Sequence, residues 1–304
     1  MSGSGVARAG TEPLTVLGVM LRSAEYLVGK GVESGRLDGE HLLAHVLGVG
    51  RLEMYLQHER PMSEDELQRF RPLLKRRGQR EPLQYILGRQ GFRELDLEVG
   101  SGVLVPRPET EQLVEVVLAW AADRRDLVAL DVGTGSGAIA LSLLLEGPFQ
   151  RVVGTDISAE ALAWASRNRA AAGEDSRLEL REGRLFGTLG SGEVFDVVVS
   201  NPPYVAETDR AGLQPEVARW EPEQALFGGQ DGLDVVRELV PGALDALKAG
   251  GLLALEIGEG QAESVVELID GAEGYEETTV QRDLAGRKRI VTARKRADRA
   301  DKGG

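Results

Sequence analysis

A short polar segment that follows an apolar run offers a group of hydrogen-bond acceptors. Residues 194–199 are mostly β-branched or aromatic and predict a buried parallel strand, which ends at Ser200-Asn201-Pro202-Pro203-Tyr204. The two prolines fix φ and remove two backbone donors, so the Asn201 side-chain oxygen and the nearby carbonyls remain as acceptors. Acceptors without donors suit a substrate that presents an NH2 group. An ordinary proline-rich loop is the alternative interpretation.

A glycine-rich segment follows another predicted strand, and its sequence is Asp131-Val132-Gly133-Thr134-Gly135-Ser136-Gly137-Ala138. Glycines at this position let the backbone turn sharply and approach a ligand closely. The spacing also fits a dinucleotide site. Asp156 ends the next predicted strand, where a carboxylate reaches the hydroxyl groups of a ribose. Its alternative role is to cap a helix, for which Ser158 also competes.

The position of Asp131 separates two nucleotide cofactors. An acid directly before the glycines would repel a pyrophosphate, but it is compatible with a sulfonium and an amino-acid ammonium group. The charge therefore favours S-adenosylmethionine over NAD. The acceptor segment at Asn201 then lies opposite the glycine loop, because both follow strands that end at the same edge of the sheet. A methyl donor and an NH2 acceptor would face each other there.

The elements that position these residues alternate between strand and helix from Leu127 onward. Strands are predicted near 127–131, 151–155, 177–181, 194–200, 251–257, 275–281 and 288–294, and helices near 137–146, 158–171, 233–248 and 260–271. This order predicts an α/β fold with a doubly wound, seven-stranded, mostly parallel sheet. The last two strands have no helix between them, so they pair as a hairpin and one strand is antiparallel.

The first third of the chain has a different character. Residues 1–12 are rich in glycine and serine and are expected to be disordered, and residues 13–89 have apolar residues at helical spacing, which predicts a small helical bundle. Residues 90–106 alternate and predict a β-hairpin linker that turns at Gly100-Ser101-Gly102. The catalytic domain is expected over 107–294, and residues 295–304 form a charged tail.

Composition excludes several classes of protein. The chain has no cysteine and 3 histidines, which excludes disulfides and thiol catalysis, and we predict no metal site. A net charge of −13 argues against stable nucleic-acid binding, because such domains are usually basic. No apolar stretch approaches ~18 residues and the start lacks a signal sequence, so we predict a cytoplasmic protein without a membrane span.

Together these segments resemble class I methyltransferases, and more closely the protein-(glutamine-N5) methyltransferases that modify the Gly-Gly-Gln loop of peptide-chain release factors. The resemblance covers nearly the whole chain. Its most selective segments are 82–88, 106–111, the glycine loop, 201–204 and 226–229. The Asn-Pro-Pro-Tyr tetrapeptide alone is shared with adenine and guanine amino-methyltransferases. The resemblance implies a Rossmann-like fold, a release factor as protein partner, and a monomer.

The resemblance also implies roles for single residues. Asn201 would contact both cofactor and substrate, and its Oδ1 together with the Pro202 carbonyl would accept the two N–H bonds of the target glutamine. Pro203, Tyr204 and Arg107 would help to hold the substrate, and the bundle would dock it. S-adenosylmethionine would be bound by Asp131, Gly133, Thr134, Gly135, Ser136, Gly137, Asp156, Leu185 and Asn201.

One position departs from the family pattern, and several functions stay open. Such enzymes often carry an acid after the third strand, but here the segment is Gly183-Arg184-Leu185, so only Leu185 is expected beside the adenine. A glutamine methyltransferase of a ribosomal protein is the nearest alternative. An adenine-N6 or guanine-N2 methyltransferase of nucleic acid is disfavoured by the net charge. A non-enzymatic S-adenosylmethionine-binding scaffold is disfavoured by the intact acceptor segment.

Overall fold

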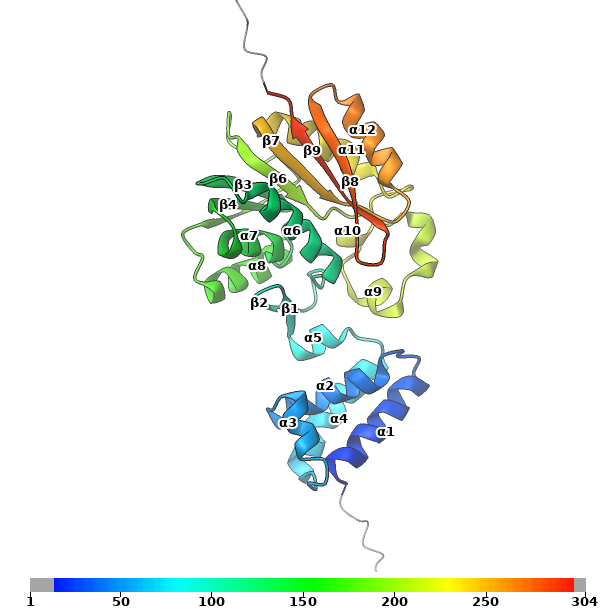
Figure 1. Ribbon diagram of the computed structural model, residues 1–304. Helices are drawn as coiled ribbons and strands as arrows, with labels where there is room; N and C mark the ends of the chain where they lie inside the picture. The colour runs from blue at the N-terminus through cyan, green and yellow to red at the C-terminus, as the bar shows by residue number, and fades with distance from the viewer. Residues whose placement is uncertain (1–13, 298–304) are drawn as a thin grey trace, which may run out of the picture. The chain divides into compact units, whose positions relative to one another are not determined.

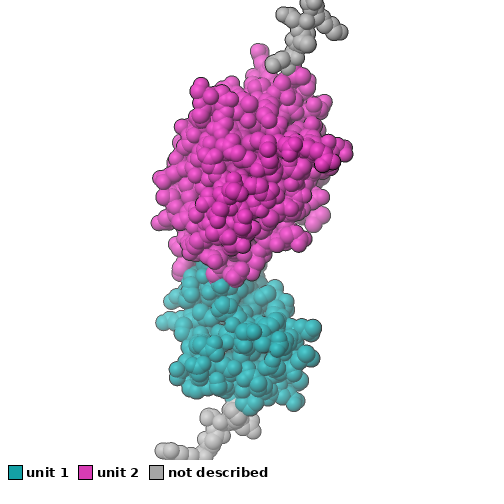
Figure 2. Space-filling view, turned by 90° about the vertical axis from the view of Figure 1, so that its left-hand side faces the viewer, with its two compact units in different colours: residues 1–87 teal, residues 88–304 magenta. Residues whose placement is uncertain are grey.

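The computed structural model describes residues 14–297, which divide between two compact units, Met1–Leu87 and Gly88–Gly304. Figures 1 and 2 show the two units. No helix among the described residues is both long and apolar enough to cross a membrane. Each unit has a hydrophobic core of its own.

The first unit is a helical bundle, as the apolar spacing of its sequence predicts. Its helices are α1 (Val16–Gly29), α2 (Gly35–Leu47), α3 (Arg51–Leu56), α4 (Glu64–Gly78) and α5 (Leu83–Leu87). Leu42, Leu43 and Met54 are fully buried in its core. α4 begins with a capping box, because the Ser63 hydroxyl accepts from the Glu66 N–H and the Glu66 carboxylate accepts from the Ser63 N–H.

The second unit begins with a β-hairpin and a helix. β1 (Arg89–Phe92) pairs with β2 (Leu95–Glu98), so the hairpin turns at Arg93 and Glu94. The hairpin that the sequence predicted around residues 100–102 is therefore wrong, although the chain does turn there, where the Val103 N–H donates to the Gly100 carbonyl at 3.4 Å. Arg93 has a φ of 49°, and its guanidinium donates to Glu146 at 2.6 Å, which holds the unexpected turn. After the hairpin comes α6 (Pro108–Ala121).

The glycines at 100 and 102 serve close packing instead of a hairpin. A Cβ at Gly100 would lie 2.5 Å from the Trp164 ring, and a Cβ at Gly102 would lie 2.4 Å from the Glu160 carboxylate. Both neighbours belong to α8 (Ala159–Ala172). The Trp164 indole N–H donates to the Ser101 carbonyl at 3.0 Å. The segment therefore needs glycine because a helix approaches its backbone closely.

The seven-stranded sheet has the order β5-β4-β3-β6-β7-β9-β8 (Figure 1), and β9 alone runs in the opposite direction to the other six strands. This confirms the predicted fold class. Its strands are β3 (Leu127–Val132), β4 (Phe149–Asp156), β5 (Leu178–Glu182), β6 (Phe195–Ser200), β7 (Leu247–Glu256), β8 (Tyr275–Arg282) and β9 (Lys288–Lys295), and the further helices are α7 (Ala138–Glu146), α11 (Asp234–Ala246) and α12 (Ala262–Gly271).

Both faces of the sheet are covered by helices. Val197 and Val199 of β6 join the core beneath α6, α7 and α8, whereas Val198 joins the core beneath α11 and α12. A strand that is buried on both faces reads as a continuous apolar run, which is why residues 194–199 could be recognised from sequence. The carboxyl ends of β3 and β6 stay in register, with Asp131 opposite Val199. The glycine loop and the Asn201 segment are thereby neighbours.

Candidate active site

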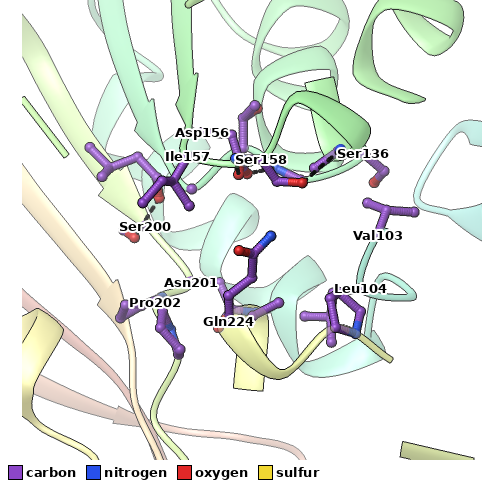
Figure 3. Close-up of a pocket in the computed structure, with 18 of the residues that line it drawn as sticks. Val103, Leu104, Ser136, Asp156, Ile157, Ser158, Ser200, Asn201, Pro202 and Gln224 are labelled. Carbon is purple, nitrogen blue, oxygen red and sulfur yellow. Dashed lines mark hydrogen bonds between the residues drawn. The ribbon is translucent and has the colours of Figure 1, made fainter. Parts of the chain in front are cut away.

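A cavity of about 350 Å³ lies at the carboxyl ends of β3, β4 and β6, and its volume is in the range of small-molecule sites. Figure 3 shows Asp156 and Ser158 in the upper part of the view and Asn201, Pro202 and Gln224 in the lower part. Most of the predicted site residues line it, namely Arg107, Gly133, Thr134, Gly135, Ser136, Asp156, Leu185, Asn201, Pro202 and Pro203. Asp131, Gly137 and Tyr204 do not.

The glycine loop takes a backbone conformation that residues with a Cβ rarely adopt. Gly133, Gly135 and Gly137 have φ values of 75°, 57° and 84°. The N–H groups of Gly133 and Thr134 both donate to the Thr155 carbonyl, at 2.8 and 2.9 Å. The loop is therefore fixed against β4 and leaves its outer side open to the cavity.

Asp156 lies at the end of β4 and fastens the same loop. Its Oδ2 accepts from the Gly135 N–H at 2.9 Å, and its Oδ1 accepts from the Ser158 N–H at 2.9 Å. Burial raises the pKa of this carboxyl, while these backbone N–H groups lower it. The N-cap of α8 is Ser158, whose side chain accepts from the Ala161 N–H. Asp156 is therefore not needed as the cap, and its carboxylate faces the cavity.

Asp131 lies behind the loop and is fully buried. Its Oδ2 accepts from the Thr134 hydroxyl at 2.7 Å and from the Ala140 N–H at 3.2 Å. Burial is the main cause that raises the pKa of this carboxyl to about 7, and the nearby charge of Asp156 raises it further. The residue predicted to contact the cofactor thus holds the shape of the loop in the structure.

The raised pKa of Asp131 predicts a pH-dependent contribution to stability. The folded chain binds this proton more tightly than the unfolded chain, so the contribution is complete below the ordinary pKa and is lost as the pH rises through about 7. The Asp131→Asn variant cannot ionise there. The free energy of unfolding of the variant minus that of wild type should therefore increase by about 2 kcal/mol from pH 5 to pH 7.

Urea unfolding of both proteins at the two pH values measures this change. The difference between the proteins is compared, because the introduced amide has its own pH-independent cost, and because other groups, including Glu256, cancel in the difference. Parallel pH dependences of the two proteins would show that Asp131 is ionised throughout.

Asn201 is held by a residue that the sequence did not single out. Its Nδ2 donates to the Thr110 hydroxyl at 3.0 Å, and that hydroxyl donates to Glu256 Oε2 at 2.7 Å. Burial raises the pKa of Glu256 to about 7. Tyr204 lies near the same carboxyl group, and burial together with that charge raises the pKa of Tyr204 to about 12. Tyr204, predicted to hold substrate, thus lies by Glu256, outside the cavity lining.

The remaining walls come from loops and from the arginines of two ion pairs. Arg107 donates to Glu221 Oε2 at 2.6 Å, and the Glu221 side chain is 1% exposed. Arg184 also lines the cavity and forms an ion pair with Glu238 of α11. Leu185 lines the cavity as predicted. A further group of lining residues was not predicted as part of the site, namely Val103, Leu104, Pro222, Gln224, Ala225 and Phe227.

Two solved structures with the same fold are methyltransferases. A methyltransferase from Pyrococcus furiosus matches with a TM-score of 0.51 and 23% identity, over 68% of this chain and 91% of that chain. The 16S rRNA N2 G1207 methyltransferase of T. thermophilus, solved with AdoMet and guanosine, matches with a TM-score of 0.50 and 19% identity, over 68% of this chain and 50% of that one. The chain therefore has the fold of class I methyltransferases.

Sequence relatives narrow the class further. Residues 20–88 match the family model of the PrmC N-terminal domain, and residues 109–216 match that of the methyltransferase small domain. The release factor glutamine methyltransferase of Geobacter sulfurreducens is 44% identical over 88% of this chain and 93% of its own length. The release factor glutamine methyltransferase of Streptomyces coelicolor is 40% identical over 92% of this chain and 98% of its own length. The chain belongs to the release factor glutamine methyltransferase family.

Proposed function

We propose that this protein transfers a methyl group from S-adenosylmethionine to the side-chain amide nitrogen of the glutamine in the Gly-Gly-Gln loop of a peptide-chain release factor. The observation that carries the proposal is the hydrogen bond from Asn201 Nδ2 to Thr110, which leaves Asn201 Oδ1 as an acceptor beside the glycine loop. The family relatives named release factor glutamine methyltransferase support the choice of substrate.

The residues of the cavity fit S-adenosylmethionine. We assign the ribose hydroxyls to Asp156, whose carboxylate lines the cavity and keeps acceptor capacity beyond its hydrogen bonds to backbone N–H groups. The loop from Gly133 to Ser136 offers backbone that can approach the amino-acid part closely, and Leu185 offers an apolar wall for the adenine. When bound, the cofactor supplies an electrophilic methyl group.

The chain itself must position a poor nucleophile. An amide nitrogen shares its lone pair with the carbonyl group, so its reaction depends on orientation more than on a base. We assign the two N–H bonds of the glutamine to Asn201 Oδ1 and the Pro202 carbonyl, with Pro203 beside them. Orientation of this kind lowers a barrier by roughly 7–11 kcal/mol. Fixed acceptors also favour the positive charge that develops on nitrogen, and the released proton can pass to water.

We further propose that the first unit docks the release factor and that the reaction occurs in the cytoplasm, where release factors act. The match of residues 20–88 to the PrmC N-terminal domain supports a family-specific role for this unit. The charge of −13 supports a protein substrate over a nucleic-acid one.

The test is transfer of labelled methyl from S-adenosylmethionine to a purified release factor. Its Gln→Ala loop variant, a ribosomal protein fraction, and a mixed pool of DNA and RNA serve as comparison substrates. Label is expected only in the release factor that retains its loop glutamine. Label confined to ribosomal protein or to nucleic acid would overturn the substrate while leaving the cofactor assignment intact.

A further inference from the structure

A line of three polar side chains runs from the cavity into the protein interior. Asn201 and Thr110 line the cavity, whereas Glu256 is 1% exposed and lies behind them. The donor–acceptor distances are 3.0 Å from Asn201 Nδ2 to Thr110 Oγ1 and 2.7 Å from Thr110 Oγ1 to Glu256 Oε2. Burying a carboxyl group is costly, so its presence behind the site calls for a function.

The fold places these residues from three separate elements. The parallel register of β6 and β7 pairs Ser200 with Leu255, so the next residues, Asn201 just after β6 and Glu256 at the end of β7, lie side by side. Thr110 lies in the first turn of α6, after Pro108. The three side chains thus meet through tertiary structure, since Thr110 and Glu256 are 146 positions apart in the sequence.

The count of hydrogens along this line decides how the Asn201 amide is oriented. A hydroxyl group has one hydrogen, and an ionised carboxylate can only accept. Thr110 therefore donates its hydrogen to Glu256 and keeps only lone pairs for Asn201. The Asn201 amide must therefore turn its NH2 group toward Thr110, and its oxygen remains as the acceptor for the substrate.

Glu256 is ionised at moderately alkaline pH. Burial and the nearby Glu109 raise its pKa, while Arg289 and the hydroxyl groups of Thr110 and Tyr204 lower it, and the resulting pKa is about 7. A measurement at pH 8 therefore examines the carboxylate form.

We propose that Thr110 and Glu256 are positioning residues that hold the Asn201 amide with its oxygen toward the cavity and so make the site select a glutamine amide over a glutamate carboxylate. The inference rests on the proposed function and adds the origin of its specificity. A glutamate would place its oxygens against the acceptors of Asn201 and Pro202, and neither side could donate. An Asn201 amide rotated by half a turn would instead offer an NH2 group, which a carboxylate could accept.

The Thr110→Val variant tests this, because valine keeps the shape of threonine and removes the hydroxyl. At pH 8, kcat for methyl transfer to the release factor is expected to fall by about 3–10-fold, as for loss of one hydrogen bond. The dissociation constant of S-adenosylmethionine should stay unchanged. Discrimination is measured as the inhibition constant of a Gln→Glu release factor divided by KM of the unmodified one, and this ratio should fall by a similar factor.

Three further variants separate positioning from a merely structural role. Thr110→Ser keeps the hydroxyl and should restore both values. Glu256→Met removes the acceptor and should reproduce the Thr110→Val effects, while the double variant should lose no more than either single variant, because both act through one residue. If Thr110→Val does not fold, Thr110→Ala replaces it, because alanine also removes the hydroxyl, and the same two quantities are measured.

The outcomes distinguish this inference from the proposed function. Unchanged turnover and unchanged discrimination in folded Thr110→Val, with an active wild type, would overturn the positioning role alone. A wild type that transfers no methyl to any release factor would overturn the proposed function and this inference together. If the losses of kcat in the double variant were additive, Thr110 and Glu256 would not both act through Asn201.

Discussion

Replacing Asn201 by alanine is expected to lower kcat for methyl transfer by about 10²–10³-fold, the loss that follows removal of one oriented polar group from an active site. The reason is that Asn201 is the only proposed acceptor whose direction is set by a hydrogen-bonded partner, Thr110. Steady-state kinetics with saturating cofactor and release factor measure the effect. Thermal unfolding should change little, since Thr110 keeps its hydrogen bond to Glu256 when Asn201 is replaced.

Gln224 provides the control for this prediction. It also carries an amide and lines the same cavity, but it belongs to the short helix α10 (Glu223–Leu226) and has no part in the proposed acceptor group. Gln224→Ala should therefore retain most of the turnover. If Asn201→Ala retained near-normal turnover, or if both variants lost the same amount, the assignment of Asn201 as the substrate acceptor would be wrong.

Replacing Asp156 by asparagine is expected to weaken S-adenosylmethionine binding by about 100-fold, which corresponds to one or two hydrogen bonds to a charged group. Asparagine has the same shape, but its single oxygen cannot serve the Gly135 and Ser158 N–H groups as well as the ribose hydroxyls. Isothermal titration calorimetry measures the dissociation constant. At saturating cofactor, kcat should recover most of its normal value.

Asp196→Asn is the matched control for the cofactor prediction. Asp196 lies near the opposite end of β6, where its Oδ2 accepts from the Val128 N–H at 2.9 Å and pairs with Lys248 at 2.7 Å. The same change there should reduce stability without altering cofactor affinity. An equal loss of affinity in both variants would show that the effect of Asp156→Asn reflects general destabilisation instead of a lost contact with the ribose.

The sheet was predictable from sequence because most of its strands are apolar on both faces. The run at 194–199 corresponds to β6, and the helix expected at 158–171 corresponds to α8. The strand ends also placed the glycine loop, Asp156 and Asn201 at one edge. The hairpin turn was mistaken because a Gly-Ser-Gly segment is typical of turns, whereas here those glycines admit Trp164 and Glu160.

The walls that close the site could not be read from local patterns. Residues 207–226 form the 3-10 helix η1 (Glu207–Gly212), α9 (Pro215–Trp220) and α10, all too short to show a period. They are held by tertiary contacts, such as the hydrogen bond from the Val205 N–H to the Leu226 carbonyl. Thr110 and Glu256 escaped notice for a related reason. The one sequence signal for Glu256 is a charged residue at the end of a strand whose preceding residues, 252–255, are apolar.

The glycine loop has a thermodynamic consequence for the cofactor. Glycine loses more conformational freedom than any other residue when it becomes ordered. Three glycines lie in this loop, and hydrogen bonds already order them in the free protein. The Gly133 N–H donates to the Thr155 carbonyl, the Gly135 N–H to Asp156, and the Gly137 N–H to the carbonyl of Thr134, whose side chain is held by Asp131. The entropy of ordering the loop is therefore lost during folding instead of during binding, so more of the contact energy appears as affinity. Cofactor affinity and the stability of the fold are thus linked through the same loop.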